Sequence, residues 1–161
     1  MGNKTWMEGI HYLDDSDKEI LIKTRRFAEA WHDGQYRKSG KPYQTHLDNV
    51  VMILSQLNQQ LITLQGGFLH DVLEDTACTE ADIQAEFGND LLGIVKGVTK
   101  LKRINFPSNI DQIAENYRQL FASMGNDIRV IIIKLVDRSH NMRTIQYLNS
   151  NKQRRIATET L

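Results

Sequence analysis

The chain has 161 residues, of which 20 are basic and 20 acidic, so its formal net charge at pH 7 is zero. This length accommodates one domain with a real core and is too short for two typical domains. The neutral balance argues against non-specific binding to nucleic acid or to a membrane surface, and it favours a small anionic partner held by a local basic patch.

The one cysteine of the chain, Cys78, has no partner for an internal disulfide and no CxxC companion for a structural zinc site. The first six residues are followed by charged residues rather than by the apolar core of a signal peptide. The longest apolar stretch, residues 130–136, is interrupted by Lys134. We therefore expect a cytoplasmic protein that is neither exported nor inserted in a membrane.

Apolar residues recur at helical spacing along most of the chain, and no convincing alternating strand pattern appears. This periodicity predicts an all-α fold, and residues 35–43 and 103–111 are expected as loops between helices. The expected helices, in chain order, span residues 14–32, 45–57, 61–76, 79–88, 89–102, 112–124, 127–148 and 152–161.

Several of these helices carry recognisable end signals. One of residues 14–16 is expected to cap the first helix, and Thr45 the second. Thr79 and Asp82 have the spacing of a capping box with Asp in place of Glu, and Gly88 ends that helix.

The long helix that begins at Asp127 contains the run Val130–Ile133, which taken locally resembles a buried strand because all four residues are β-branched. We interpret it as helix because no partner strand is visible elsewhere. The helical periodicity also continues through Leu135, Met142 and Ile145.

The hexapeptide His70–Asp75 places an imidazole and three carboxylates in less than two turns of the expected helix. Helical geometry puts Glu74 on the face of His70 and Asp71, with Asp75 over Asp71. A solvated acidic helix end is the simpler interpretation, but the segment before His70 shows no polar face. Crowded carboxylates on such a helix repel one another unless a cation or a proton lies among them, so the hexapeptide indicates a divalent metal site or strongly shifted pKa values.

An all-helical protein assembles a metal site from side chains on several helices, and His46 and Asp137 are the best further candidates. Taken singly, His46 fits a capped, partly exposed helix start better than a metal ligand, and Asp137 fits an ion pair to Arg138, Arg129 or Lys134 better. Together with His70 and Asp71 they form a nitrogen and oxygen donor set that suits Mn²⁺, Fe²⁺, Zn²⁺ or Mg²⁺. Such a site supports hydrolysis, and Glu74 and Asp75 are placed to transfer protons beside it.

Two further segments are suited to an anionic ligand. The loop 35–43 contains three cations, a hydroxyl and two aromatic side chains around a glycine, a composition suited to phosphates and base stacking, although it also fits a solvated basic turn. On the helix of Asp137, the side chains of His140, Asn141 and Thr144 follow at i+3, i+4 and i+7. Asn141 and Thr144 are therefore candidates to hydrogen-bond a base or ribose.

Taken together, these motifs resemble a known family. His70-Asp71, separated from His46 and Asp137, is similar to the H…HD…D pattern of the HD-domain metal phosphohydrolases. The finer resemblance is to the N-terminal hydrolase domain of the RelA/SpoT alarmone enzymes. It rests on His32-Asp33-Gly34-Gln35, on residues 37–43 and 70–76, on Gly97-Val98-Thr99-Lys100-Leu101, and on residues 127–129 and 137–144.

The resemblance implies an all-α HD-domain helical bundle with Mn²⁺ as cofactor and a guanine nucleotide as substrate. The implied reaction is a 3′-pyrophosphohydrolysis that converts ppGpp or pppGpp to GDP or GTP. The implied metal ligands are His46, His70, Asp71 and Asp137, and the implied catalytic carboxylates are Glu74 and Asp75. The implied substrate-binding residues are Arg37, Lys38, Ser39, Asn141 and Thr144.

The chain departs from the family pattern at three places. Leu47 stands where the family usually has proline, and Gly66-Gly67 replace small helix formers at a cost of roughly 1 kcal/mol each unless close packing needs them. The sequence also ends where the family continues. We therefore expect residues 1–161 to be a single, truncated hydrolase domain without a synthetase part, whose exposed apolar surface favours a homo-oligomer.

Two alternatives to alarmone hydrolysis remain open from the sequence. One is an HD phosphohydrolase that acts on another nucleotide, and the other is a non-catalytic guanine-nucleotide-binding regulatory domain.

Overall fold

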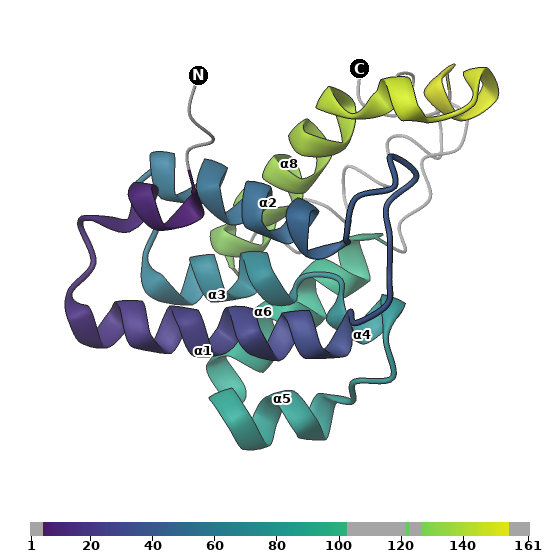
Figure 1. The fold of residues 1–161 in the computed structure, drawn as a ribbon. Helices are drawn as coiled ribbons and strands as arrows, with labels where there is room; N and C mark the ends of the chain where they lie inside the picture. Colours follow the sequence, from purple (N-terminus) through teal and green to yellow (C-terminus); the bar gives the residue numbers. More distant parts are fainter. Residues whose placement is uncertain (1–4, 103–121, 123–126, 155–161) are drawn as a thin grey trace.

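The computed structural model describes residues 5–102, 122 and 127–154. Within these residues the fold is helical, and the one β interaction is an isolated antiparallel bridge between Tyr36 and Pro42. The all-α prediction is therefore confirmed (Figure 1). The elements are the 3₁₀ turn η1 (Trp6–Ile10), α1 (Asp15–Trp31), α2 (Gln44–Gln56), α3 (Leu61–Leu69), α4 (Val72–Asp75), α5 (Glu80–Phe87), α6 (Asn89–Lys102), α8 (Ile128–Arg143) and the 3₁₀ turn η2 (Ile145–Tyr147).

Helix α3 is the centre of the packing. It contacts α1, α2, α6 and α8, and its residues from Thr63 to Leu69 are all buried. Figure 1 shows α1, α3 and α2 side by side, with α8 running diagonally behind α2. Helix α3 carries no charged residue, and its polar Gln65 bonds to Thr24 of α1. A helix without a charged face is stable only when it is covered on all sides, which explains its central position.

The two glycines of α3 make this close packing possible. A Cβ on Gly66 would lie 2.7 Å from Ile133 Cδ1 and 2.9 Å from Ile94 Cγ2, and a Cβ on Gly67 would lie 2.6 Å from Leu54 Cδ1. The side chains of α2, α6 and α8 therefore occupy the space that alanine would need. Close helix packing is the reason for the departure from the family pattern at these positions.

Most of the predicted helix signals are confirmed. The Asp14 carboxylate accepts from the Asp17 amide at the start of α1, and Thr79 and Asp82 form the expected capping box. Gly88 ends α5 with a φ of 86°, in the left-handed region that glycine adopts readily. The β-branched run at Val130 is helical, so the strand alternative is wrong.

The predicted helix over residues 61–76 is wrong in one respect, because it breaks at His70 and Asp71 into α3 and α4. The His70 ring contacts the Gly67 carbonyl through Nδ1 at 2.7 Å. In a continuous helix this carbonyl would accept from the Asp71 amide, so the side chain competes with the backbone for it. The break separates the two halves of the hexapeptide.

Two predicted boundaries are also corrected. Helix α2 begins at Gln44 without a side-chain cap, so Thr45 lies inside the first turn and does not cap it. Helix α8 ends at Arg143 rather than near residue 148, because the Thr144 hydroxyl bonds to the His140 and Asn141 carbonyls and the chain continues into η2.

The prediction of a helix over residues 152–161 is met for 152–154, which belong to a helical segment that begins at residue 150. The predictions of a loop at 103–111 and of a helix at 112–124 lie outside the described residues, except for residue 122, which is helical. None of the described helices has both the length and the apolar character needed to span a membrane.

Candidate functional site

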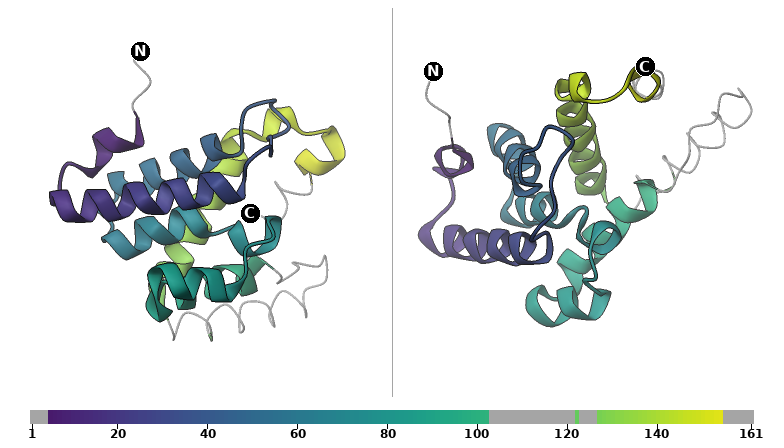
Figure 2. Two further views of the ribbon diagram at one scale, coloured as in Figure 1. Left: turned by 60° about the horizontal axis from the view of Figure 1, so that its bottom comes forward. Right: turned by 45° about the vertical axis from the view of Figure 1, so that its right-hand side comes forward.

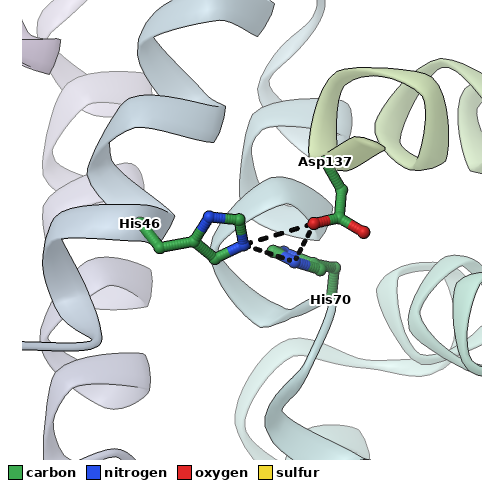
Figure 3. Close-up of side chains that lie close together, drawn as sticks. All are labelled: His46, His70 and Asp137. Carbon is green, nitrogen blue, oxygen red and sulfur yellow. Dashed lines mark hydrogen bonds and ion pairs between the residues drawn. The ribbon is translucent and has the colours of Figure 1, made fainter. Parts of the chain in front are cut away.

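Three side chains from separate elements converge in the interior (Figure 3). His46 comes from α2, His70 from the turn after α3, and Asp137 from α8. The His46 and His70 Nε2 atoms lie 3.3 Å apart, and Asp137 Oδ1 lies 3.3 Å and 3.6 Å from them. Each residue is at most 4% exposed. Burial of this kind shows that the cluster belongs to the packed fold and is not a chance surface grouping.

The fourth predicted ligand, Asp71, joins this cluster. Its Oδ2 lies 2.9 Å from His70 Nε2 and 3.9 Å from His46 Nε2. The Tyr43 hydroxyl donates a hydrogen bond to the same oxygen. The structure therefore brings all four predicted ligand side chains together, although only His46, His70 and Asp137 offer donor atoms that all lie within 4.8 Å of one another.

Both imidazole rings are held so that Nε2 faces the cluster. The His70 Nδ1 lies 2.7 Å from the Gly67 carbonyl, which can only accept, so Nδ1 carries a hydrogen. The His46 Nδ1 lies 2.7 Å from the Nδ1 of His140, so one of these two nitrogens donates and the other accepts. When His46 donates, both Nε2 atoms present lone pairs to the cluster, which is the orientation of metal-binding histidines.

Asp137 is anchored from its own helix. Lys134 Nζ lies 2.9 Å from Oδ2, and the Asn141 amide donates to Oδ1 at 2.8 Å. The ion-pair alternative for Asp137 is thus realised with Lys134, through the oxygen that does not face the histidines. The alternative partner Arg129 instead binds Asp127.

The electrostatics of the cluster favour a positive charge beside its two carboxylates. Burial opposes the charged form of His70, but Asp71 and Asp137 outweigh this effect and raise the pKa of His70 to about 10. Burial also opposes ionisation of Asp137, yet its contacts with the His46 and His70 rings hold its pKa well below the usual range. Burial lowers the pKa of His46. Two imidazoles and two carboxylates around one point are a donor set that fits a divalent metal as well as a proton.

The carboxylates Glu74 and Asp75 lie in α4, directly after the break. Asp75 is exposed, and Glu74 is half-buried. The Tyr43 hydroxyl, which bonds to Asp71, is also 3.4 Å from Asp75 Oδ2. Tyr43 therefore bridges the buried cluster and the more exposed acidic turn.

A pocket of about 370 Å³ opens beside this bridge. It joins the loop 35–43 to the end of α8, and both views in Figure 2 show this loop, in dark blue, beside the yellow segment after α8. The Arg37 guanidinium donates to Asn141 Oδ1 at 3.0 Å and to Thr144 Oγ1 at 3.2 Å. All five predicted substrate residues line the pocket, together with Tyr36, Tyr43, Arg138, Tyr147, Leu148 and Lys152.

Sequence reasoning missed three contributors to the site. Tyr43 was expected only as a base-stacking aromatic, whereas its hydroxyl contacts two carboxylates. His140 was expected on the polar face of its helix and not as the partner of His46. Gln35 donates to the Asp75 carbonyl at 2.6 Å. Their proximity in the sequence to predicted site residues was a signal, but the contacts themselves cross between elements.

The comparison with known families assigns a class to this architecture. The HD domain family matches residues 24–161. The chain belongs to the HD domain family.

More specific similarities point to one group of enzymes. The chain is 48% identical over 141 residues to a probable guanosine-3′,5′-bis(diphosphate) 3′-pyrophosphohydrolase of Synechocystis sp., covering 88% of this chain and 19% of that protein. It is 43% identical over 150 residues to the bifunctional (p)ppGpp synthase/hydrolase SpoT of Escherichia coli, covering 93% and 21%. A GTP pyrophosphokinase of Myxococcus xanthus is 42% identical over 153 residues, covering 93% and 20%. The chain thus spans about a fifth of the length of these relatives.

A solved structure shares the fold. It is that of a metazoan ortholog of SpoT, described as hydrolysing ppGpp and as playing a role in starvation responses. The TM-score is 0.68 at 24% sequence identity, and the match covers 92% of this chain and 85% of that one. This likeness shows that the two chains share a fold.

Proposed function

We propose that this chain is a metal-dependent 3′-pyrophosphohydrolase of guanosine-3′,5′-bis(diphosphate), which converts ppGpp or pppGpp to GDP or GTP and pyrophosphate. The observation that carries the proposal is the position of Tyr43. This residue lines the basic pocket and also hydrogen-bonds to Asp71, so a nucleotide in the pocket would have its phosphates beside the buried cluster. The names of the relatives from Synechocystis and Escherichia coli support the same reaction.

His46, His70, Asp71 and Asp137 would hold the metal, for which we propose Mn²⁺. Nitrogen and oxygen donors in equal number suit this ion, and the orientation of both Nε2 atoms supports the assignment. The bound metal would supply Lewis-acid stabilisation of negative charge at the phosphoryl group. Lys134 and Asn141 hold the Asp137 carboxylate in place for this task.

Arg37, Lys38, Ser39, Asn141 and Thr144 would bind the nucleotide. The guanidinium and the ammonium neutralise phosphate charge, and the hydroxyl and amide groups offer hydrogen bonds to ribose or base. The Arg37 contacts to Asn141 and Thr144 keep the two walls of the pocket together.

Glu74 and Asp75 would act as the acid and base of the reaction. Both lie one turn beyond Asp71, and the contact between Tyr43 and Asp75 keeps this turn beside the cluster. One carboxylate accepts the proton of the attacking water, and the other donates a proton to the leaving oxygen.

We further propose that the described helices form one hydrolase domain and that residues 1–161 contain no synthetase part. A cytoplasmic location fits a chain whose one cysteine, Cys78, is free and buried.

The test is an assay of the purified chain with Mn²⁺ and ppGpp at neutral pH, with identification of the released phosphate species. We expect pyrophosphate and GDP. The Glu74→Gln and Asp75→Asn variants should each lower kcat by about 100-fold or more, because a general acid or base contributes about that much. Their affinity for Mn²⁺ should stay within a few-fold of wild type, since neither residue is a proposed ligand.

A matched control is Glu19→Gln on the exposed surface of α1, which should leave kcat unchanged. A metal-loaded protein that leaves ppGpp intact but hydrolyses another nucleotide would identify a different HD phosphohydrolase. Binding of ppGpp without turnover would instead indicate a regulatory nucleotide-binding domain.

A further inference from the structure

The segment His32-Asp33-Gly34-Gln35 takes no part in the roles assigned above, yet it makes specific contacts beneath the site. Gly34 has a φ of 73°, a left-handed conformation that turns the chain sharply after α1. The main-chain N–H of Gln35 donates to the His32 carbonyl at 3.0 Å within this turn. The turn therefore brings the Gln35 side chain back onto the His32 ring.

The side chains of His32 and Gln35 form a directed chain of hydrogen bonds. Gln35 Nε2 donates to the Asp75 carbonyl at 2.6 Å, and this contact requires the amide nitrogen because a carbonyl only accepts. Gln35 Oε1 is then left to accept from His32 Nδ1, at 2.9 Å. The orientation of the Gln35 amide is thereby fixed from both sides.

The His32 ring also supports Tyr43. The two rings stack with centroids 4.6 Å apart and an interplanar angle of 17°. His32 is 3% exposed, and its Nε2 has no hydrogen-bond partner among the residues that the structure describes. An imidazole buried with one nitrogen unsatisfied costs stability compared with an apolar ring. What histidine offers here and an apolar ring does not is the hydrogen bond from Nδ1 to Gln35.

The contacts of Gln35 and Tyr43 attach the loop 35–43 to α4 at two points. Gln35 and Tyr43 are themselves joined at the base of the loop, where the Tyr43 amide donates to the Gln35 carbonyl at 2.9 Å. Gln35 holds the main chain of Asp75, and the Tyr43 hydroxyl contacts the carboxylates of Asp71 and Asp75. The tip of the same loop carries Arg37, which lines the pocket.

We propose that Gln35 is a positioning residue that fixes the Glu74–Asp75 turn relative to the nucleotide pocket, and that His32 holds Gln35 in the required orientation. The proposal rests on the proposed hydrolase function. Gln35 reaches the acidic pair only through the Asp75 carbonyl, so its loss should displace that pair. The pocket residues should stay in place, because Arg37 is held separately by Asn141 and Thr144. The effect should therefore fall on kcat, with KM little changed.

Two substitutions separate the bonds of Gln35. Gln35→Glu keeps an oxygen that accepts from His32 but removes the donor to Asp75, and Gln35→Met removes both without adding charge. Both should lower kcat for ppGpp by about tenfold or more, because small displacements of reacting groups have effects of this order. KM should stay within about threefold of wild type.

The matched controls are Gln59→Glu and Gln59→Met. Gln59 also donates from Nε2 to a main-chain carbonyl, that of Leu57 at 3.2 Å, but it lies beyond the end of α2 opposite to His46. These variants should retain wild-type kcat and KM. His32→Phe keeps an aromatic ring against Tyr43 and should lower kcat, and adding it to Gln35→Met should give little further loss if both residues act through one chain of bonds.

Hydrogen exchange gives a readout that is independent of turnover. The amides of Glu74 and Asp75 bond to the Asp71 carbonyl at 3.2 Å and 2.9 Å. Their exchange should be faster in Gln35→Met than in wild type or Gln59→Met. If the wild-type protein hydrolyses no ppGpp but exchange is still faster in Gln35→Met than in wild type, the proposed function would be refuted while the role of Gln35 in holding the turn would be supported.

Three results would overturn the inference while leaving the proposed function intact. The first is unchanged kcat and unchanged exchange in both Gln35 variants. The second is a loss of kcat/KM that arises wholly from KM, which would show that Gln35 serves the pocket instead. The third is an equal loss in the Gln59 variants.

Discussion

The two buried imidazoles face each other through Nε2 because each ring has its other nitrogen engaged elsewhere. His70 uses Nδ1 for the Gly67 carbonyl, and His46 uses Nδ1 for His140. Two neutral rings in this orientation would bring lone pairs together at 3.3 Å, which is unfavourable without a positive charge beside them. A proton on His70 supplies that charge in the metal-free protein, and a divalent metal would supply it in the loaded protein. The donor atoms are therefore oriented before a metal arrives.

The contact between His140 and His46 predicts that His140 sets the metal affinity. Removing the ring in His140→Ala leaves the buried Nδ1 of His46 without its partner and frees the His46 ring to rotate. Loss of such an outer partner of a metal ligand typically weakens binding about 10- to 100-fold. We expect a loss of this order in the Kd for Mn²⁺, measured by calorimetry or electron paramagnetic resonance without substrate.

The control for this experiment is His11→Ala, because His11 is exposed and lies outside the cluster. Its Kd for Mn²⁺ should equal that of wild type. An unchanged Kd in His140→Ala would mean that packing alone orients His46.

At the scale of single residues, the sequence indicates which side chains form the cluster but not which other side chains contact them. His46 and Asp137 could be selected because metal sites need imidazoles and carboxylates near helix ends, and both lie in the cluster. The Tyr43 contact to Asp71 and the His140 contact to His46 cross 28 and 94 residues of chain. Periodicity gives the face of a helix on which a side chain lies, but the neighbour on another helix depends on how the helices pack.

At the scale of elements, α3 determines how closely the ligand-bearing helices approach one another. It lies against both α2 and α8, which carry His46 and Asp137, and it ends at the turn that carries His70. The glycines at 66 and 67 allow this approach because the side chains of the neighbouring helices fill the space beside them. The distances within the cluster thus depend on two residues that have no side chain.

Gly66→Ala is expected to destabilise the protein by about 1–3 kcal/mol, the usual effect of an added methyl group in a filled core. The new Cβ would overlap Ile133 and Ile94, both buried, at 2.7 Å and 2.9 Å. The free energy of unfolding should be measured by urea titration in the presence of a chelator, so that metal binding does not contribute.

Gly93→Ala, on α6, is expected to have the opposite effect on the free energy of unfolding. Nothing lies within 4 Å of its Cβ position, and the residue is exposed. This substitution should stabilise the protein by up to about 1 kcal/mol through helix propensity. A Gly66→Ala variant as stable as Gly93→Ala would show that the core around α3 adapts freely.

The elements themselves were largely predictable where local chemistry decides them. The Thr79 capping box and the Gly88 terminator depend on residues a few positions apart, and both are confirmed. The break after Leu69 was not predicted, because it depends on the His70 ring competing for a backbone carbonyl in a segment with continuous helical periodicity. Thr45 does not cap α2, because the helix already begins at Gln44 and the preceding residue, Tyr43, has a helical backbone conformation.

At the scale of the whole molecule, the cluster joins segments that are distant in sequence. Its four side chains connect α2, the turn between α3 and α4, and α8, so a bound metal would link helices that are far apart in the sequence. A ligand that binds only the folded state stabilises it in proportion to the logarithm of its concentration over Kd. We therefore expect Mn²⁺ to raise the thermal unfolding temperature and a chelator to reverse the increase.

The pH dependence of this stabilisation follows from His70. Its pKa is raised to about 10 in the folded protein, against 6.5 for the ordinary side chain, because Asp71 and Asp137 outweigh the effect of burial. In the metal-free protein the stabilisation by protonated His70 is fully present below about pH 6.5, and it is lost as the pH rises through about 10.

A metal requires the neutral His70 ring, so binding near pH 7.5 must displace roughly one proton. The increase in unfolding temperature caused by Mn²⁺ should therefore grow between about pH 6.5 and 9. Calorimetry in buffers of different ionisation enthalpy measures the released proton directly. Binding without proton release, together with a metal effect that is constant across this range, would show that His70 is already neutral in the folded protein.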